Sequence, residues 1–328
     1  MVDIPSQDTL FSIQSAEELQ NAALHIFRYQ ASENTVYRRF IKELDLKVDT
    51  VETLSDIPFL PIDFFKNHQI ICGDEQPEIV FSSSGTSGAS QSQHHVKDLS
   101  FYTTSFRKSF KHFYGDIKEY TLLALLPSYQ EREGSSLIYM IDHLIKESEC
   151  TLSGYFLYNH DELFDVLTRL KKDNKKAILM GVTYALLDFV EHFQIIFPNL
   201  IVMETGGMKG KRKEMIREEL HEVLCRGFGA TAIHSEYGMT ELLSQAYSGG
   251  NGKFNCPPWM KVSIRDINDP LTLLAPGFAG GINVIDLANL HSCSFIASQD
   301  LGKLFNDGTF EVLGRFDNSD IRGCNLLI

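Results

Sequence analysis

The hexapeptide EYGMTE, residues 236–241, places an aromatic ring, a glycine, a hydroxyl and a carboxylate close together along the chain. The ring of Tyr237 can stack on a purine, and the hydroxyl of Thr240 can hold a carboxylate or a phosphate. The carboxylate of Glu241 can bind Mg²⁺. A tight turn into a capped helix would explain the same residues equally well. The hexapeptide alone therefore leaves a nucleotide site and an ordinary turn open.

Apolar runs alternate with amphipathic stretches around this hexapeptide. The apolar runs predict buried strands at 78–82, 120–128, 176–182, 199–207 and 280–288. Apolar residues at helical spacing predict helices at 135–147, 184–194 and 209–224, and a helical N-terminal segment over about residues 1–50 that begins behind a Ser15–Glu18 capping box. Strands separated by helices predict an α/β fold with largely parallel pairing. Because no Pro/Ser-rich or charged linker divides the chain, we expect residues 1–328 to form a single domain.

Composition excludes several classes of protein. A formal net charge of -13 argues against the basic surface that nucleic acids require. The six cysteines include no C-x-x-C pair, which favours reduced thiols over a disulfide framework or a zinc cluster. The N-terminus MVDIPSQDTLFSIQ lacks the features of a signal peptide, and no apolar run is long enough for a membrane span. We therefore expect a cytoplasmic protein.

A second polar stretch, VFSSSGTSGASQ at 80–91, follows a predicted strand. Glycine lets the backbone turn several N–H groups toward one point, and the hydroxyls add donors, so this loop suits a polyphosphate. It is not a Walker A loop, because no Gly-Lys-Ser/Thr closes it. A Ser/Gly linker is the alternative interpretation, and the preceding strand argues against it.

A third stretch, METGG at 203–207, places Gly206 and Gly207 directly after another apolar run. A backbone without side chains would let adenine or an acyl group approach closely. A plain strand-to-helix turn explains the two glycines equally well.

QDLG (299–302) and GRFDNSDIRG (314–323) follow these three stretches. In chain order, the five motifs are the Ser/Gly loop at 80–91, METGG, EYGMTE, QDLG and GRFDNSDIRG. Five motifs in this order resemble the adenylate-forming enzymes, the superfamily of acyl- and aryl-CoA synthetases. Within that superfamily the chain looks most like the LuxE-type acyl-protein synthetases, which activate a fatty acid with ATP and capture it as a thioester on their own cysteine. This likeness extends from about residue 50 to the end and rests on PFLPIDFFK (58–66), LLPSYQEREGSSLIYM (125–140), ETGGMKG (204–210) and the C-terminal RGC.

The resemblance implies the fold of the adenylate-forming N-terminal large domain, with layered sheets and helices. It also implies ATP and Mg²⁺ as cofactors and a fatty acid or another carboxylic acid as substrate. Tyr237 would pack on adenine, and Gly206 and Gly207 would line the space between adenine and the acyl group. The phosphate-loop residues that would hold the β- and γ-phosphates are Ser83, Ser84, Gly85, Thr86 and Gly88.

The same resemblance assigns roles to four further residues. Thr240 would contact the α-phosphate, and Glu241 would bind the magnesium. Asp300 would hold the ribose with help from Arg315. The sequence departs from the superfamily because its phosphate loop has no lysine before Lys97, so the phosphates would need another cation. The candidates for that cation are His94, His95, Lys97 and Arg132.

Cys324 lies in the C-terminal RGC, where the resemblance places the acyl acceptor. CoA synthetases continue beyond the hinge motif into a small C-terminal domain, whereas here the hinge region spans only 314–328, and we expect that domain to be absent. A built-in thiol would then replace CoA and pass the acyl group to a reductase or an acyltransferase. An unreactive apolar role for Cys324 is the alternative.

Two other functions remain open from the sequence. The chain could ligate an aryl or acyl group to CoA or to a carrier protein. It could also be a non-catalytic protein that binds a nucleotide or an acyl ligand, an interpretation that the absent loop lysine supports.

Overall fold

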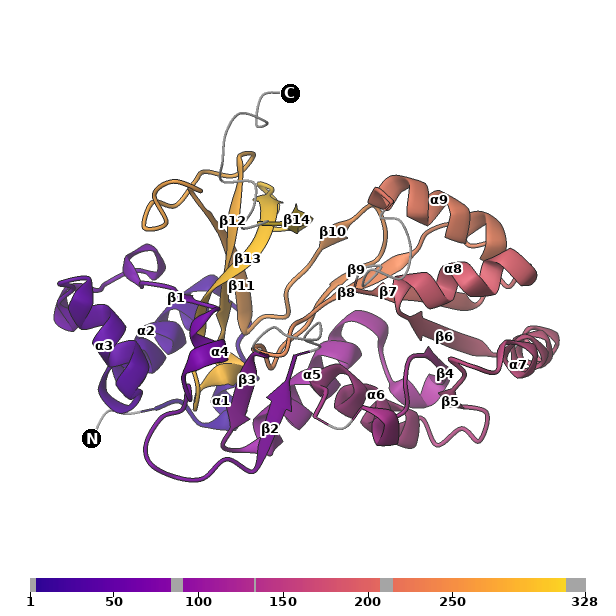
Figure 1. Ribbon diagram of the computed structural model, residues 1–328, viewed down its shortest axis with the longest axis horizontal. Coiled ribbons are helices and arrows are strands. Elements are labelled where there is room, and N and C mark those ends of the chain that lie inside the picture. Colours follow the sequence, from indigo (N-terminus) through magenta and orange to yellow (C-terminus); the bar gives the residue numbers. More distant parts are fainter. Residues whose placement is uncertain (1–3, 84–90, 133, 207–214, 317–328) are drawn as a thin grey trace.

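The computed structural model describes residues 4–83, 91–132, 134–206 and 215–316. Within these ranges the chain forms two six-stranded sheets and a two-stranded hairpin. Figure 1 shows the N-terminal helices on the left, one of the six-stranded sheets near the centre, and the other six-stranded sheet with its helices on the right. The α/β class predicted from the sequence is confirmed.

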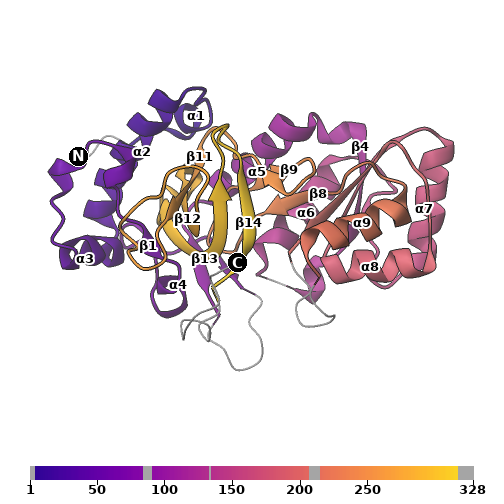
Figure 2. The same cartoon turned by 90° about the horizontal axis from the view of Figure 1, so that it is seen from above.

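The first sheet has the strand order β5-β4-β6-β7-β8-β9, and only the β8–β9 pair is antiparallel. Its central strands are buried because helices cover both faces, with α5 and α6 on one side and α8 and α9 on the other (Figure 2). The strands are β4 (Tyr120–Leu125), β5 (Gly154–Tyr155), β6 (Lys176–Gly181), β7 (Leu200–Thr205), β8 (His234–Tyr237) and β9 (Ala246–Ser248). The helices are α5 (Leu99–Tyr114), α6 (Ser136–Glu147), α7 (His160–Lys172), α8 (Thr183–His192) and α9 (Arg217–Phe228).

The second sheet corrects the prediction of largely parallel pairing. Its order is β10-β14-β13-β12-β11, all antiparallel, with β1 added parallel to β13. Between residues 260 and 315 only a short 3-10 helix interrupts the strands, so consecutive strands return directly as antiparallel neighbours. The strands are β1 (Leu60–Pro61), β10 (Lys253–Phe254), β11 (Met260–Arg265), β12 (Ala279–Asp286), β13 (Phe295–Leu304) and β14 (Phe310–Arg315).

The N-terminal segment is helical, as predicted. Ser15 and Glu18 form the expected capping box at the start of α2. On α2, the buried Gln30 donates to the carbonyls of Asn289 and Leu290, which attaches this helix to the second sheet. The helices are α1 (Gln7–Leu10), α2 (Ala16–Glu33), α3 (Thr35–Glu43) and α4 (Phe64–Asn67), and the 3-10 helices are η1 (Val48–Thr50), η2 (Leu54–Asp56), η3 (Ile117–Glu119), η4 (Tyr129–Glu131) and η5 (Leu287–Asn289).

Two elements differ in their bounds from the sequence prediction. The strand expected at 78–82 is β2 (Ile79–Ser82), which pairs with β3 (Gln93–Val96) in an antiparallel hairpin that carries the predicted phosphate loop. The helix expected at 209–224 begins only at Arg217 and continues to Phe228. Residues 209–214 lie outside the described ranges.

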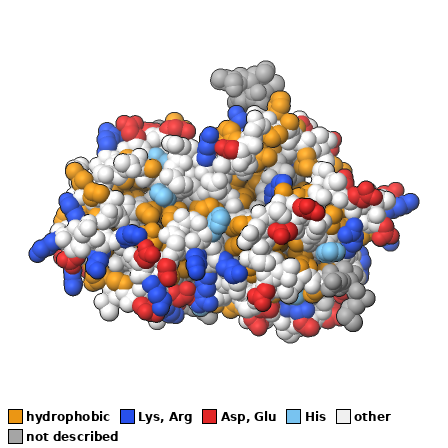
Figure 3. Space-filling model, turned by 180° about the vertical axis from the view of Figure 1, so that it is seen from behind, with side chains coloured by type: hydrophobic (Ala, Val, Ile, Leu, Met, Phe, Trp, Pro, Cys, Tyr) orange, Lys and Arg blue, Asp and Glu red, His pale blue; other side chains and the backbone are white. Residues whose placement is uncertain are grey.

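The surface carries charges of both signs. Figure 3 shows acidic and basic side chains interspersed with apolar ones over the face opposite to that of Figure 1. Among the described helices, none combines the length and the apolar character needed to cross a bilayer.

Candidate active site

Tyr237, Asp300 and Arg315 form a hydrogen-bonded chain that joins the two sheets. The Tyr237 hydroxyl donates to Asp300 Oδ2 at 2.8 Å, and Arg315 Nε donates to Asp300 Oδ1 at 3.1 Å. Tyr237 is the last residue of β8, whereas Asp300 and Arg315 face each other on β13 and β14. The Asp300 side chain is 11% exposed and that of Arg315 71% exposed, so a nearly buried carboxylate meets a cation at the surface.

The Tyr237 ring is packed among aromatic side chains. It meets Phe254 and Phe310 edge to face, with ring centroids 5.9 and 5.4 Å away. Burial, together with the neighbouring Asp300 charge, holds the pKa of Tyr237 well above its usual value, so the hydroxyl keeps its proton. The structure therefore gives the hydroxyl a partner in Asp300, while stacking of the ring on adenine stays a prediction.

Glu241 lies in the turn that follows β8. Its side chain accepts a hydrogen bond from Ser92, and its main-chain carbonyl accepts one from Asn289 Nδ2 at 2.8 Å. Burial raises the pKa of Glu241, and the nearby Arg315 charge opposes that rise. A buried carboxylate beside Asp300 fits a Mg²⁺ ion, because this ion needs only one or two carboxylates when a substrate's phosphates complete its shell. Among the described residues no group of three acidic, histidine or cysteine side chains could form a complete cage by itself.

The main-chain carbonyl of Thr240 is held by a buried histidine. His94 on β3 is fully buried, and its Nδ1 lies 2.8 Å from the Thr240 carbonyl oxygen. Because a carbonyl only accepts, Nδ1 must carry the proton. Burial lowers the pKa of His94 to about 4, so the ring is neutral. The turn after β8 is thereby fixed to the hairpin that carries the phosphate loop.

Gly206 follows β7 directly and has a positive φ of 65°. Its carbonyl accepts from Thr183 Oγ1 at 2.8 Å, which fixes the backbone at the end of the strand. Since β7 and β8 are parallel, Gly206 and Tyr237 lie at the same edge of the first sheet. Beside them, the Thr205 hydroxyl donates to Glu236 Oε2 at 2.8 Å. Burial raises the pKa of Glu236 to about 7.

Ser83 closes the base of the predicted phosphate loop. Its N–H donates to the Ser92 carbonyl and its Oγ accepts from the Ser92 N–H, each at 3.0 Å. Several predicted site residues lie outside the described ranges. These are Ser84, Gly85, Thr86 and Gly88 of the loop, Gly207, and the predicted acyl acceptor Cys324. The described residues thus bring Ser83, Thr240, Glu241, Tyr237, Asp300 and Arg315 into one connected region, with Gly206 at the same sheet edge.

The chain that forms this region matches a known protein family over nearly its whole length. Residues 4–328 match the family described as acyl-protein synthetase, LuxE. The chain belongs to the LuxE acyl-protein synthetase family. The match confirms the family and the ligase class predicted from the sequence motifs. A comparison with curated protein sequences found no match.

Solved structures support the fold of this LuxE-family chain. Crystal structures of 2-hydroxyisobutyryl-CoA ligase in complex with its acyl-adenylate match 96% of the chain and 72% of their own length, with a TM-score of 0.66 and 12% identity in one case. ATP-bound MatB from Rhodopseudomonas palustris matches 74% of the chain with a TM-score of 0.54 and 16% identity. The chain spans about half of the MatB structure, 49% of its length. These likenesses confirm the predicted large-domain fold of adenylate-forming enzymes.

The structure narrows the choice of a phosphate-neutralising cation in this LuxE-family chain. His94 is excluded, because its ring is buried and neutral near pH 7. Lys97 is 18% exposed and forms an ion pair with Glu75 at 2.5 Å, so its charge is already compensated. Arg315 instead forms an ion pair with Asp300 of the QDLG motif. His95 and Arg132 stay predictions.

Sequence reasoning missed several residues of the site. Ser92 and Asn289 carry no motif signal, because both act through single hydrogen bonds to Glu241. Arg265 is another omission: it donates to Asn283 Oδ1 at 2.9 Å and to the Ser298 carbonyl, and its charge interacts with that of Asp300. Glu236 could have been noticed, since it directly precedes the tyrosine of the quoted hexapeptide.

Proposed function

We propose that this chain activates a fatty acid with Mg-ATP and transfers the acyl group to Cys324. A carboxylate oxygen of the acid would attack the α-phosphorus of ATP and release pyrophosphate. The Cys324 thiolate would then attack the carbonyl carbon of the acyl-adenylate and release AMP, leaving a thioester. The observation that carries the proposal is the Tyr237–Asp300–Arg315 chain beside Glu241, within a LuxE-family fold.

The described side chains suit the first step. Asp300 retains lone pairs beyond its two hydrogen bonds and could accept from ribose hydroxyls. Arg315, whose side chain is largely exposed, could donate to a phosphate from the same position. Thr240 would donate to the α-phosphate, and Glu241 would hold Mg²⁺, which neutralises phosphate charge when it is bound.

The other cysteines make poor acceptors. Burial raises the pKa of Cys72, Cys256 and Cys293, which disfavours their thiolates. The pKa of Cys225 is also raised by burial. These four thiols therefore lack the reactivity that the second step requires.

Cys150 is the exception, but it lies at the wrong edge of the sheet. Burial opposes ionisation of Cys150, yet hydrogen bonds from Thr121, Leu152 and Ser153 outweigh it and lower the pKa. The Cys150 sulfur lies 3.3 Å from Thr121 Oγ1, near the start of β4. Gly206 and Tyr237 lie at the ends of parallel strands, so the sheet separates Cys150 from them by roughly 17 Å.

Cys324 is within reach of the site along the chain. It is the eighth residue after Phe316, and eight residues of extended chain span at most roughly 30 Å. Phe316 directly follows Arg315, which touches Asp300. A C-terminal thiol could thus be delivered to an acyl-adenylate bound beside Asp300, and the acyl-protein could then supply a reductase or an acyltransferase. The five described cysteines are free thiols, which suits a reducing compartment such as the cytoplasm.

Intact-protein mass spectrometry tests both steps. The protein is incubated with Mg-ATP and a series of carboxylic acids, beside Cys324→Ser and, as a matched control, Cys150→Ser. We expect an acyl-sized mass gain that hydroxylamine removes, present in Cys150→Ser and absent from Cys324→Ser. Pyrophosphate release without an adduct would replace self-acylation with an external acceptor such as CoA or a carrier protein. The absence of both signals would favour a non-catalytic nucleotide-binding protein.

A further inference from the structure

The turn after β8 is held by neutral hydrogen-bond donors from two different parts of the chain. His94 Nδ1 donates to the Thr240 carbonyl, and Asn289 Nδ2 donates to the Glu241 carbonyl, each at 2.8 Å. Ser92 bonds the Glu241 side chain. The main-chain carbonyls of Thr240 and Glu241 are therefore both fixed, and the Glu241 carboxylate is held as well.

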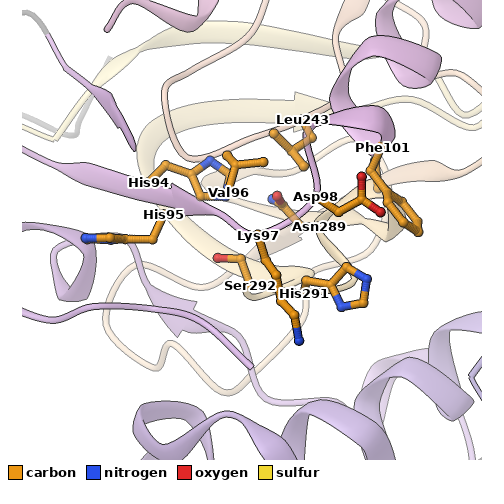
Figure 4. A pocket seen from close by; sticks show the side chains of 11 residues that line it. His94, His95, Val96, Lys97, Asp98, Phe101, Leu243, Asn289, His291 and Ser292 are labelled. Atoms are coloured by element: carbon orange, nitrogen blue, oxygen red, sulfur yellow. The ribbon is translucent and has the colours of Figure 1, made fainter. Parts of the chain in front are cut away.

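Two of these three donors come from one strand end. Ser92 directly precedes β3 and His94 is the second residue of that strand, both on the far side of the loop that begins at Ser83. Figure 4 shows His94 and His95 pointing to different sides of this strand. His94 is thus directed to the Thr240 turn, and the hairpin and the turn cannot shift independently while its hydrogen bond is intact.

The surroundings of His94 leave this hydrogen bond as the only polar contact of the ring that the structure describes. The ring meets Phe65 edge to face at a centroid distance of 5.7 Å. Its Nε2 is buried and has no hydrogen-bond partner among the described residues. A leucine would satisfy packing against Phe65 better than a half-satisfied imidazole, so packing alone does not account for a histidine here.

We propose that His94 is a positioning residue, which sets Thr240 and Glu241 in register with the β2–β3 hairpin through its hydrogen bond to the Thr240 carbonyl. This inference rests on the proposed adenylation function. Thr240 and Glu241 would act at the α-phosphate and the metal, whereas the loop would act at the outer phosphates. A fixed connection between the turn after β8 and the hairpin would keep the carboxylate oxygen of the acid aligned with the α-phosphorus of ATP. A displacement of about 1 Å would cost up to about 100-fold in rate.

Three substitutions separate positioning from packing. Asparagine carries an amide nitrogen where histidine carries Nδ1, so His94→Asn retains the donor. His94→Leu has a similar volume without any donor, and His94→Gln moves the amide nitrogen one atom further out. His160→Leu is the matched control, because His160 also has a buried unpartnered Nε2 and meets Phe189 at 5.7 Å, but lies on α7 away from the site.

The assay is carboxylate-dependent exchange of pyrophosphate into ATP, with kcat and KM for ATP measured separately. For His94→Leu we expect kcat to fall about 10- to 100-fold while KM changes less than about threefold. His94→Asn should recover most of that loss, and His94→Gln should recover little. His160→Leu should match the parent protein. Equal kcat for His94→Leu and the parent, or equal losses for His94→Asn and His94→Gln, would overturn the proposal.

Hydrogen exchange of the free protein gives a readout that needs no activity. Amides of residues 239–245 should exchange faster in His94→Leu than in His94→Asn, and His160→Leu should leave them unchanged. A parent protein without pyrophosphate exchange would refute the proposed function, yet this measurement would still decide whether His94 holds the turn. If His94→Leu does not fold, the comparison of His94→Asn with His94→Gln decides the same question in both assays.

Discussion

Asp300 and Arg315 are direct neighbours across β13 and β14, and their side chains meet at 3.1 Å at the point where the strand register shifts. The shift lies between Leu301 and Gly302, one residue beyond the Asp300–Arg315 pair. The ion pair therefore depends on an irregularity in the sheet, and the QDLG motif contains both the carboxylate and the glycine that permits this irregularity.

Gly302→Ala should disturb this arrangement. A Cβ atom at Gly302 on β13 would lie 2.6 Å from both the Glu311 carbonyl oxygen on β14 and Ile282 Cδ1 on β12. The neighbouring strands would therefore have to move away from β13. We expect a loss of about 1–3 kcal/mol in the free energy of unfolding, measured with urea, together with weaker ATP binding. Gly308→Ala is the control for a less crowded glycine, because a Cβ there meets nothing within 4 Å, although its φ of 82° still imposes backbone strain. A larger loss for Gly308→Ala would contradict the steric argument.

Arg315→Ala should weaken ATP binding by about tenfold, since a charge-assisted contact to phosphate or ribose would be lost. The effect on stability should stay within about 0.5 kcal/mol, because the Arg315 side chain is 71% exposed and its ion pair is screened. ATP-dependent shifts in melting temperature measure the affinity. Arg226→Ala is a matched control, as Arg226 is 72% exposed and pairs with Glu222 on α9. Similar ATP affinity for both variants would argue against a substrate contact by Arg315.

Glu241→Gln should raise the Mg²⁺ concentration needed for half-maximal activity and lower kcat by roughly 10- to 100-fold, because a neutral amide is a weaker magnesium ligand than a carboxylate. The Mg²⁺ dependence of ATP-induced thermal stabilisation provides a second measurement. Glu222→Gln, an exposed carboxylate on α9, should change neither quantity. An unchanged Mg²⁺ requirement in Glu241→Gln would remove this residue from the metal site.

Glu236 should make the stability of the fold depend on pH. Its pKa is raised from 4.5 to about 7, mainly by burial, so the folded protein holds a proton that the unfolded chain has already released between these values. The contribution of this proton to the free energy of unfolding is complete below pH 4.5 and is lost as the pH rises through 7. Relative to Glu236→Gln, the free energy of unfolding of the parent protein should fall by on the order of 3 kcal/mol between pH 4.5 and pH 7, and it should fall no further above pH 7.

Urea unfolding at several pH values measures this difference directly. Glutamine keeps an oxygen that can accept from the Thr205 hydroxyl, so the substitution removes the titration and little else. Parallel stability curves for the two proteins would show that Glu236 is ionised in the folded state throughout.

Much of the first sheet could be predicted from the sequence, because parallel strands covered on both faces are continuous apolar runs such as the one at 176–182. The second sheet was harder to predict. Its strand β13 alternates between buried and partly exposed residues and contains Ser298, Gln299 and Asp300, so it does not form an apolar run. Its pairing with β1 depends on a contact with residues 60 and 61, far away along the chain.

The candidate site shows the same division. Tyr237, Thr240 and Glu241 lie within one hexapeptide, and the resemblance assigned them roles from that local pattern. His94 was considered only as a cation, since sequence gives its charge at full hydration and not the burial that neutralises it. Asn289 could not be found at all, because its contact with Glu241 spans 48 residues and uses only a main-chain carbonyl.

The attachment of α2 also determines when the protein can fold during synthesis. Gln30 forms a hydrogen bond with Ser294, 264 residues later in the chain. The first long helix to leave the ribosome therefore has no native partner for its buried amide until most of the polypeptide has been made. Until then the part of α2 that packs against the second sheet, where Phe27 meets Phe295, has no native surface to contact, so the yield of folded protein should depend on chaperones and on the rate of translation.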